Sequence, residues 1–229
     1  MVFDIDDTLF PERDYVRSGY RAVCERLRRG LGCGGSTATA AIGPMEDWLW
    51  GRFLSGRTAG AFDALSERFR LGLSRGRIEE LVEVYRNHRP DIRPYGEMPF
   101  LLGRLRESFL LGLLSDGYLP AQRHKLQALG LERFFDAMAF TRELGRDAWQ
   151  PSPRGFEVMR EKLGVPHEAC AFVADNPAKD FVAANKLGWR TVQYLQPGQV
   201  HAANVPPDGG RPQFSARGPD ELRSLLQPA

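Results

Sequence analysis

Residues 2–10 of this chain read VFDIDDTLF, a short apolar run that ends in three aspartates, Asp4, Asp6 and Asp7. Side chains two positions apart in an extended segment point to the same side, so Asp4 and Asp6 form a pair. Like charges a few ångströms apart destabilise a fold unless a cation neutralises them. So much negative charge at the end of a short strand indicates a functional site.

Further short apolar runs occur at residues 109–115, 137–140, 170–174 and 191–195. Each is apolar on both faces and is followed by polar, Gly or Pro residues, which is typical of buried parallel strands. Between the later runs lie helical patterns, and each is followed by a glycine, where helices commonly end. These patterns span 119–129, 153–163 and 178–187, and the glycines are Gly130, Gly164 and Gly188. The alternation predicts an α/β fold, a Rossmann-like doubly wound parallel sheet.

Residues 14–92 break this alternation because they contain no convincing strand. We expect an α-helical insert here, with residues 1–13 and 93–229 forming the sheet domain. Within the insert, residues 32–44 (GCGGSTATAAIGP) look like a flexible connection between helices. Near the other end, the Pro- and Gly-rich stretch 197–218 favours irregular structure. Residues 219–226 then predict a short closing helix, capped by Asp220 or by the preceding turn.

Composition excludes several classes of protein. The 229 residues carry a net charge of +2 and are 42% hydrophobic and 26% charged, which is ordinary for a globular protein and too balanced for a nucleic-acid-binding face. No apolar run reaches the length of a membrane span. The three cysteines show no metal-ligand spacing and no leader is seen, so we expect a cytoplasmic protein. Monomer and homodimer both remain open. The cysteines are Cys24, Cys33 and Cys170.

Several acidic groups follow predicted strands. Ser115 and Asp116 come after the second strand, and Asp175 comes after the apolar run that ends at residue 174. Ligands of open α/β sheets bind outside the carboxyl ends of the strands, so these groups and the first aspartates should meet at one edge. Oxygen ligands that are mostly carboxylates favour a hard divalent ion, most simply Mg²⁺, and such a metal with open positions invites a phosphate.

Three segments resemble motifs of one known family. DIDDTL (4–9) is similar to the first motif, DxDxT, of the haloacid dehalogenase superfamily. LLGLLSDG (110–117) resembles the second motif, an apolar strand ending in Ser or Thr, and AFVADNPAKD (171–180) resembles the fourth. The order and spacing agree, and the helical insert at 14–92 has the position of that family's C1 cap domain.

The resemblance implies a role for each matching residue. Asp4 would be the nucleophile, Asp6 the general acid and base, and Thr8 would orient that pair. Ser115 would hydrogen-bond the phosphoryl group, and Mg²⁺ would be held by Asp4, the backbone carbonyl of Asp6, and Asp175. Asp180 would orient the metal shell or a lysine. Three further residues are candidate phosphate-binding groups with turn or cap roles as alternatives: Asp116, Gly117 and Asn176.

The third motif departs from the family pattern. The family places a lysine before a Pro-x-Pro helix start, whereas RDAWQPSPRGF (146–156) has Gln150 at that position. Losing a preorganised charged contact costs about 2–4 kcal/mol in the transition state. Three interpretations remain open: a neighbouring cation replaces the lysine, the enzyme is slow, or the protein binds phosphate or metal without turnover. The candidate cations are Arg142, Arg146 and Lys179.

The function implied by the resemblance is Mg²⁺-dependent hydrolysis of a phosphomonoester on a small soluble metabolite, through a phosphorylated Asp4. An inactive phosphate- or metal-binding regulator is the alternative. A haloacid dehalogenase is a weaker one, because dehalogenases lack an acid at the position of Asp6. Neither nucleic acid nor membrane is expected as a partner.

Overall fold

A parallel six-stranded sheet organises the chain, with strand order β3-β2-β1-β4-β5-β6. The computed structural model describes residues 1–30 and 36–226. Every neighbouring pair of strands runs parallel. The strands are β1 (Val2–Phe3), β2 (Gly112–Ser115), β3 (Ala137–Phe140), β4 (Ala171–Ala174), β5 (Arg190–Tyr194) and β6 (Phe214–Ala216).

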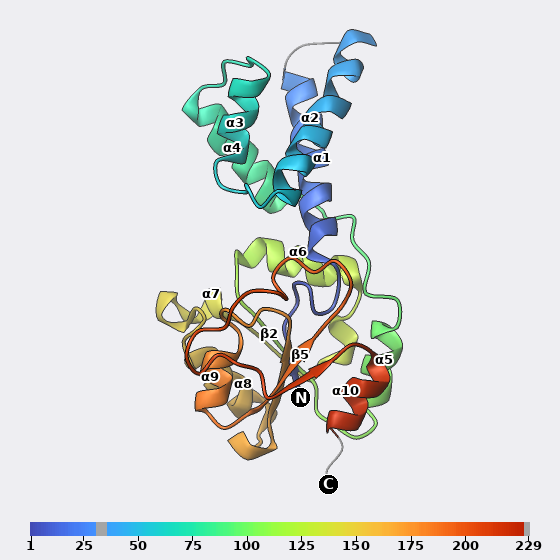
Figure 1. Ribbon diagram of the computed structural model, residues 1–229, viewed down its shortest axis with the longest axis vertical. Helices are drawn as coiled ribbons and strands as arrows, with labels where there is room; N and C mark the ends of the chain where they lie inside the picture. Colours follow the sequence, from blue (N-terminus) through green and yellow to red (C-terminus); the bar gives the residue numbers. More distant parts are fainter. Residues whose placement is uncertain (31–35, 227–229) are drawn as a thin grey trace. The chain divides into compact units, whose positions relative to one another are not determined.

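Helices cover both faces of this sheet (Figure 1). On one side lie α8 (Arg154–Leu163) and α9 (Phe181–Lys186), and on the other α5 (Met98–Leu105) and α10 (Pro219–Leu226). All residues of β2 and β4 are buried, as expected of central strands covered twice. The prediction of a Rossmann-like doubly wound sheet is therefore confirmed. The remaining elements of this part are α6 (Leu119–Leu129), α7 (Thr141–Leu144) and the 3₁₀ turns Glu132–Phe134, Arg146–Ala148 and His167–Ala169.

Aromatic side chains fill the core between α8 and the sheet. The ring of Phe156 meets Phe172 edge-on at 4.9 Å between centroids and Trp189 at 5.3 Å. Gly112 lies where α8 approaches β2 closely, since a Cβ there would be 2.6 Å from the sulfur of Met159. This packing fixes β2, whose last residue belongs to the candidate site.

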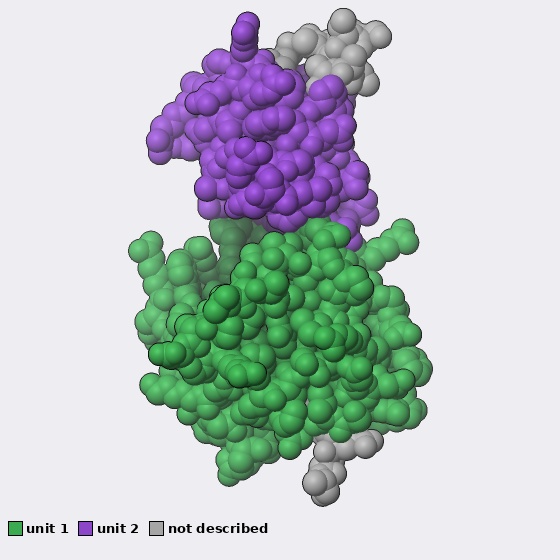
Figure 2. Space-filling view, in the orientation of Figure 1, with its two compact units in different colours: residues 1–13, 92–229 green, residues 14–91 purple. Residues whose placement is uncertain are grey.

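The chain divides into two units, shown in different colours in Figure 2. One comprises residues 1–13 and 92–229 and contains the sheet; the other comprises residues 14–91 and is entirely helical where the structure assigns regular elements. Its helices come from α1 (Glu12–Gly30), α2 (Ser36–Leu54), α3 (Ala61–Arg68) and α4 (Arg75–Asn87). Ile92 joins the sheet unit, one residue away from the boundary expected from the sequence.

The helical unit has a hydrophobic core of its own. Tyr20, Leu49, Leu65 and Leu81, one from each helix, are buried in it. The Tyr20 ring also packs edge-on against Phe62. Because this core is separate from that of the sheet, residues 14–91 form a distinct folding element inserted after the first strand.

Three elements differ from the sequence expectations. Residues 36–44 belong to α2, although the glycines and Pro44 suggested a connection; residues 32–35 lie outside the described part. The predicted irregular stretch 197–218 contains β6, which pairs in parallel with β5. Helix α5 follows the insert at Met98–Leu105, where no helix was assigned. The closing helix spans 219–226 as predicted. Its Glu221 carboxylate accepts a hydrogen bond from the Arg217 N–H at 2.7 Å and so holds the preceding turn against the helix.

No helix in the described ranges is both long and apolar enough to cross a bilayer.

The two described cysteines, Cys24 and Cys170, are buried free thiols, and Cys33 lies outside the described residues. Burial raises the pKa of the Cys24 thiol to about 12, so this thiol stays protonated and acts as a packing group.

Candidate functional site

The candidate site lies at the carboxyl ends of the three central strands. β1 is flanked by β2 and β4, so the residues that follow these strands are neighbours. The N–H of Asp4 donates to the Val173 carbonyl at 3.0 Å, which continues the β1–β4 pairing by one residue. Ser115 ends β2, and Asp175 directly follows β4.

Three carboxylates meet there. Asp4, Asp175 and Asp180 each offer an oxygen within 4.8 Å of the other two, and all three side chains are buried. Oδ2 of Asp175 and Oδ1 of Asp180 have no hydrogen-bond donor among the described residues. Buried carboxylate oxygens without donors are costly, so these atoms fit a bound cation.

The electrostatics agree with that interpretation. Burial, followed by the charges of Asp180 and Asp4, raises the pKa of Asp175 to about 10. Burial likewise raises the pKa of Asp180 to about 6 and that of Asp4 well above its ordinary value. Without a cation the cluster therefore holds protons at neutral pH, and a divalent ion would replace them.

The Asp6 side chain is not part of this cluster. Its Oδ1 and Oδ2 accept from Nζ of Lys125 at 2.7 and 2.9 Å, and Oδ2 also accepts from Nε2 of Gln122 at 3.0 Å. Burial opposes ionisation of Asp6, but Lys125 and Gln122 outweigh it, so the Asp6 pKa lies below its ordinary value. The two aspartates of the first motif thus occupy different environments and can take different roles.

Lys179 is the second lysine of the site. Its Nζ lies 3.7 Å from Oδ1 of Asp180, and the side chain is 38% exposed. Burial alone would lower the pKa of Lys179, but Asp180 and then Asp4 raise it above its usual range, with smaller effects from Asp116 and Asp6. The field of this ammonium group therefore acts on the carboxylate cluster.

Of the other two cations proposed in place of the missing lysine, one is engaged elsewhere and the other is exposed. The guanidinium of Arg142 lies 4.3 Å from the centre of the Trp149 ring, a cation–π contact. Arg146 is exposed in its 3₁₀ turn. The amide of Gln150 is half-buried, and neither its nitrogen nor its oxygen has a hydrogen-bond partner in the described structure. Of the three candidates, Lys179 has the electrostatic contact with Asp4.

Two hydroxyl groups of the site are buried without partners in the described part of the chain. They are Oγ1 of Thr8 and Oγ of Ser115. A buried hydroxyl without a partner is unfavourable, so each can donate to an incoming ligand oxygen. Ser115 stands at a strand end beside Asp4, which suits the phosphoryl contact that the sequence predicts.

The remaining phosphate-binding candidates serve the surrounding turns. The Asp116 carboxylate accepts a hydrogen bond from the Thr141 hydroxyl. The Asn176 side-chain oxygen accepts from the Ala178 N–H at 3.1 Å, and the Asn176 backbone N–H donates to Oδ2 of Asp180 at 2.9 Å. Gly117 has φ of +140°, and a Cβ there would be 2.6 Å from the Gln122 nitrogen. These contacts shape the two loops that carry Ser115 and Asp180.

Asp7, to which the sequence assigned no chemical role, ties two loops together. Asp7 is fully buried, and its backbone adopts the left-handed conformation with φ of +49°. Its carboxylate accepts from the backbone N–H groups of Val200 and Glu12, at 2.5 and 2.7 Å, and its carbonyl accepts from Gln199. Asp7 therefore anchors the start of α1 and the segment after β5 to the first motif.

Sequence reasoning missed Gln122 and Lys125. Both lie on α6, and both are buried with Leu126 and Leu129 on one face of that helix. The spacing 122, 125, 126, 129 is that of an apolar helical face, so a lysine and a glutamine within it are out of place unless they are paired. The lysine on this apolar helical face was the feature of the sequence that could have indicated a buried acidic partner.

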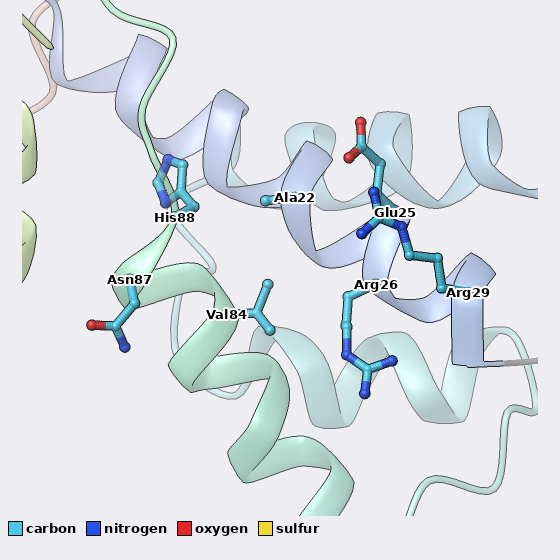
Figure 3. A pocket seen from close by; sticks show the side chains of 7 residues that line it. All are labelled: Ala22, Glu25, Arg26, Arg29, Val84, Asn87 and His88. Atoms are coloured by element: carbon cyan, nitrogen blue, oxygen red, sulfur yellow. The ribbon is translucent and has the colours of Figure 1, made fainter.

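A cavity of about 320 Å³ opens on the helical unit and is shown in Figure 3. Its lining includes Arg26, Arg29 and His88. Arg26 pairs with Glu80, and both ring nitrogens of His88 are engaged, one with the Ser18 hydroxyl at 2.8 Å and the other with the Tyr85 carbonyl at 2.6 Å. Arg26 and His88 are therefore engaged in contacts within the helical unit.

A family model described as haloacid dehalogenase-like hydrolase matches residues 1–188. The chain belongs to this hydrolase family. The haloacid dehalogenase-like chain is also 26% identical to a glyceraldehyde 3-phosphate phosphatase of Methanopyrus kandleri, over 99% of its own length and 96% of that protein. It is 30% identical to a phosphoserine phosphatase of Thermus thermophilus, over 84% and 86% of the two lengths.

Among solved structures, a phosphatase of the same family from Thermococcus onnurineus matches with a TM-score of 0.60 and 26% identity, covering 98% of this chain and 96% of that one. The predicted family resemblance is confirmed. The prediction of a phosphoric monoester hydrolase is likewise confirmed at the level of the family, since the relatives are named phosphatases.

Proposed function

We propose that this chain is a Mg²⁺-dependent phosphatase that hydrolyses a small phosphomonoester through a phosphorylated Asp4. The observation that carries the proposal is the buried cluster of Asp4, Asp175 and Asp180, with carboxylate oxygens that lack donors in the described residues. Asp4, Asp175 and Asp180, with the backbone carbonyl of Asp6, would hold the ion, which would neutralise charge between the nucleophile and the phosphate.

The protein's own groups divide the chemistry. The Asp4 carboxylate attacks phosphorus, and the bond from phosphorus to the leaving oxygen breaks. Asp6 gives a proton to that oxygen and later takes one from the water that attacks phospho-Asp4. Ser115 donates a hydrogen bond to a phosphoryl oxygen. The Thr8 hydroxyl, expected from the sequence to orient the two aspartates, has no partner among the described residues and is available to a second ligand oxygen. Lys179 supplies the positive charge that Gln150 cannot provide.

The substrate is a phosphate ester of a primary alcohol. The names of two relatives support this, because glyceraldehyde 3-phosphate and phosphoserine both carry phosphate on a CH₂ oxygen. The helical unit, residues 14–91, would act as the cap that excludes water and selects among such esters. The presence of Asp6 disfavours a dehalogenase, which has no leaving oxygen to protonate.

Phosphate release from a panel of primary alkyl phosphomonoesters tests this function. We expect turnover of at least one ester with Mg²⁺ and loss of turnover after chelation. A protein that binds Mg²⁺ but hydrolyses no ester in the panel would contradict the phosphatase and favour the non-catalytic binder that Gln150 suggests.

The stability of the metal-free protein should fall with rising pH because of Asp175. With a folded pKa of about 10, this group keeps its proton in the folded state, whereas in the unfolded chain the proton is lost near the ordinary value of 3.8. Across about pH 7 to 9 the folded state therefore binds one proton more than the unfolded chain at this group. The free energy of unfolding then falls by about 1.4 kcal/mol for each unit by which the pH rises. Chemical denaturation of the wild type against Asp175→Asn isolates this contribution.

The same comparison tests the metal site. Mg²⁺ should stabilise the wild type by about 2.7 kcal/mol when its free concentration is a hundred times the dissociation constant, and more at high pH than at low pH. Asp175→Asn should remove most of this gain. Equal stabilisation of both proteins by Mg²⁺ would place the ion elsewhere.

A further inference from the structure

Lys125 is a buried cation that pairs with one carboxylate of the site, that of Asp6. Its side chain is 5% exposed and that of Asp6 is 20% exposed, and the amine reaches both Asp6 oxygens. Lysine is rarely buried unless it is paired. An ion pair with so little solvent exposure constrains both partners far more than a surface pair would.

Gln122 completes the arrangement one turn earlier on α6. Its Nε2 donates to Oδ2 of Asp6 at 3.0 Å and lies 3.3 Å from the Asp116 carbonyl. One helix therefore holds the Asp6 carboxylate from two positions, and the same amide group contacts the loop after β2. Side chains of α6 therefore hold the Asp6 carboxylate in place.

This hold separates two carboxylates that strand geometry would bring together. Asp4 and Asp6 are two residues apart, yet the cluster that could hold an ion contains Asp4, Asp175 and Asp180 without the side chain of Asp6. If Asp6 were free to turn, it could approach that cluster as a fourth carboxylate. A carboxylate on the cation could not serve the leaving oxygen.

We propose that Lys125, assisted by Gln122, is a positioning residue that holds the Asp6 carboxylate off the ion-binding cluster and beside the leaving oxygen. The proposal rests on the phosphatase function above. Lys125 transfers no proton itself. Asp6 is ionised in the resting pair and takes up one proton when the phosphomonoester binds. It delivers this proton to the leaving oxygen as the phosphorus–oxygen bond breaks and regains one from the water that attacks phospho-Asp4, so it ends each turnover protonated, as it began it.

Leaving-group dependence distinguishes this role from a purely structural one. An alkyl alcohol needs a proton to leave, whereas p-nitrophenolate leaves without one. In Lys125→Met, kcat/KM for a primary alkyl phosphate should fall about a hundredfold and kcat/KM for p-nitrophenyl phosphate less than about tenfold. Gln122→Met should shift this ratio in the same direction by a smaller factor. Lys162→Met, a lysine whose amine donates to the Met138 carbonyl away from the site, is the matched control and should leave the ratio unchanged.

Thermal unfolding supplies a readout independent of turnover. Lys125→Met should lower the Tm of the wild type clearly, but should lower that of Asp6→Asn much less, because the charge it pairs with is already gone. An equal loss of kcat/KM on both esters, or an equal drop in Tm in both backgrounds, would overturn the role of Lys125. Absence of turnover by the wild type would instead overturn the phosphatase, and the role of Lys125 with it.

Discussion

Asp4→Asn is expected to release phosphate at least about ten thousandfold more slowly than the wild type, since an amide cannot attack phosphorus and no second nucleophile takes over. Asp4 is buried, and its N–H is paired to β4 in the sheet. The substitution keeps the shape of the side chain, so these contacts survive. Initial rates on the best ester of the panel, with Mg²⁺ present, measure the effect.

Loss of the fold would not explain such a result. Burial and neighbouring carboxylates raise the pKa of Asp4, so its charge is unfavourable in the metal-free protein. Asp4→Asn should therefore unfold at the same Tm as the wild type, or a higher one, in chelator. Asp208→Asn, an exposed turn residue, is the matched control and should keep full activity. Residual activity of Asp4→Asn within about tenfold of the wild type would remove Asp4 from the mechanism.

Lys179→Met is expected to lower kcat/KM by about a hundred- to a thousandfold, which corresponds to about 2.7–4 kcal/mol of transition-state stabilisation. The reason is that Lys179 is the cation whose field reaches Asp4, whereas Arg142 lies over Trp149. Steady-state kinetics on the same ester measure the loss, with Lys162→Met as the control for removing a lysine.

Introducing the family's lysine at position 150 provides a more specific test of the role of Lys179. If Lys179 does the work of the absent motif lysine, Gln150→Lys should recover much of the activity in the Lys179→Met background. It should also raise the rate of the wild type only modestly, because the charge is already supplied. Failure of Gln150→Lys to rescue Lys179→Met would mean that Lys179 only pairs with Asp180, 3.7 Å away.

Much of the fold followed from local patterns. The run at 137–140 and the helix at 119–129 match β3 and α6 residue for residue, because short buried strands and glycine-ended helices leave clear signals. β6 was missed because it is three residues long and two of them, Phe214 and Ser215, are exposed, so no buried run marks it. The start of α2 was missed because glycines and a proline outweighed the alanines around them.

Some residues of the site could likewise be predicted from local sequence patterns, and others could not. Asp4 and Asp175 could be found from the sequence because both follow strands, and parallel strands bring their carboxyl ends together. Lys125 could not be paired with Asp6 in this way, because 119 residues separate them and the contact depends on how α6 packs. The choice of Lys179 over Arg142 and Arg146 likewise needed the positions of the side chains.

Chemical trapping of Asp4 tests the central claim most directly. An acyl phosphate can be reduced by borohydride after rapid quenching, which converts the aspartate into homoserine that peptide mass spectrometry can locate. The account predicts homoserine at position 4 when substrate and Mg²⁺ are present, and none without substrate or in Asp4→Asn. Phosphate release by the wild type with the phosphoryl group on another residue, or with no trapped enzyme at any quench time, would contradict it.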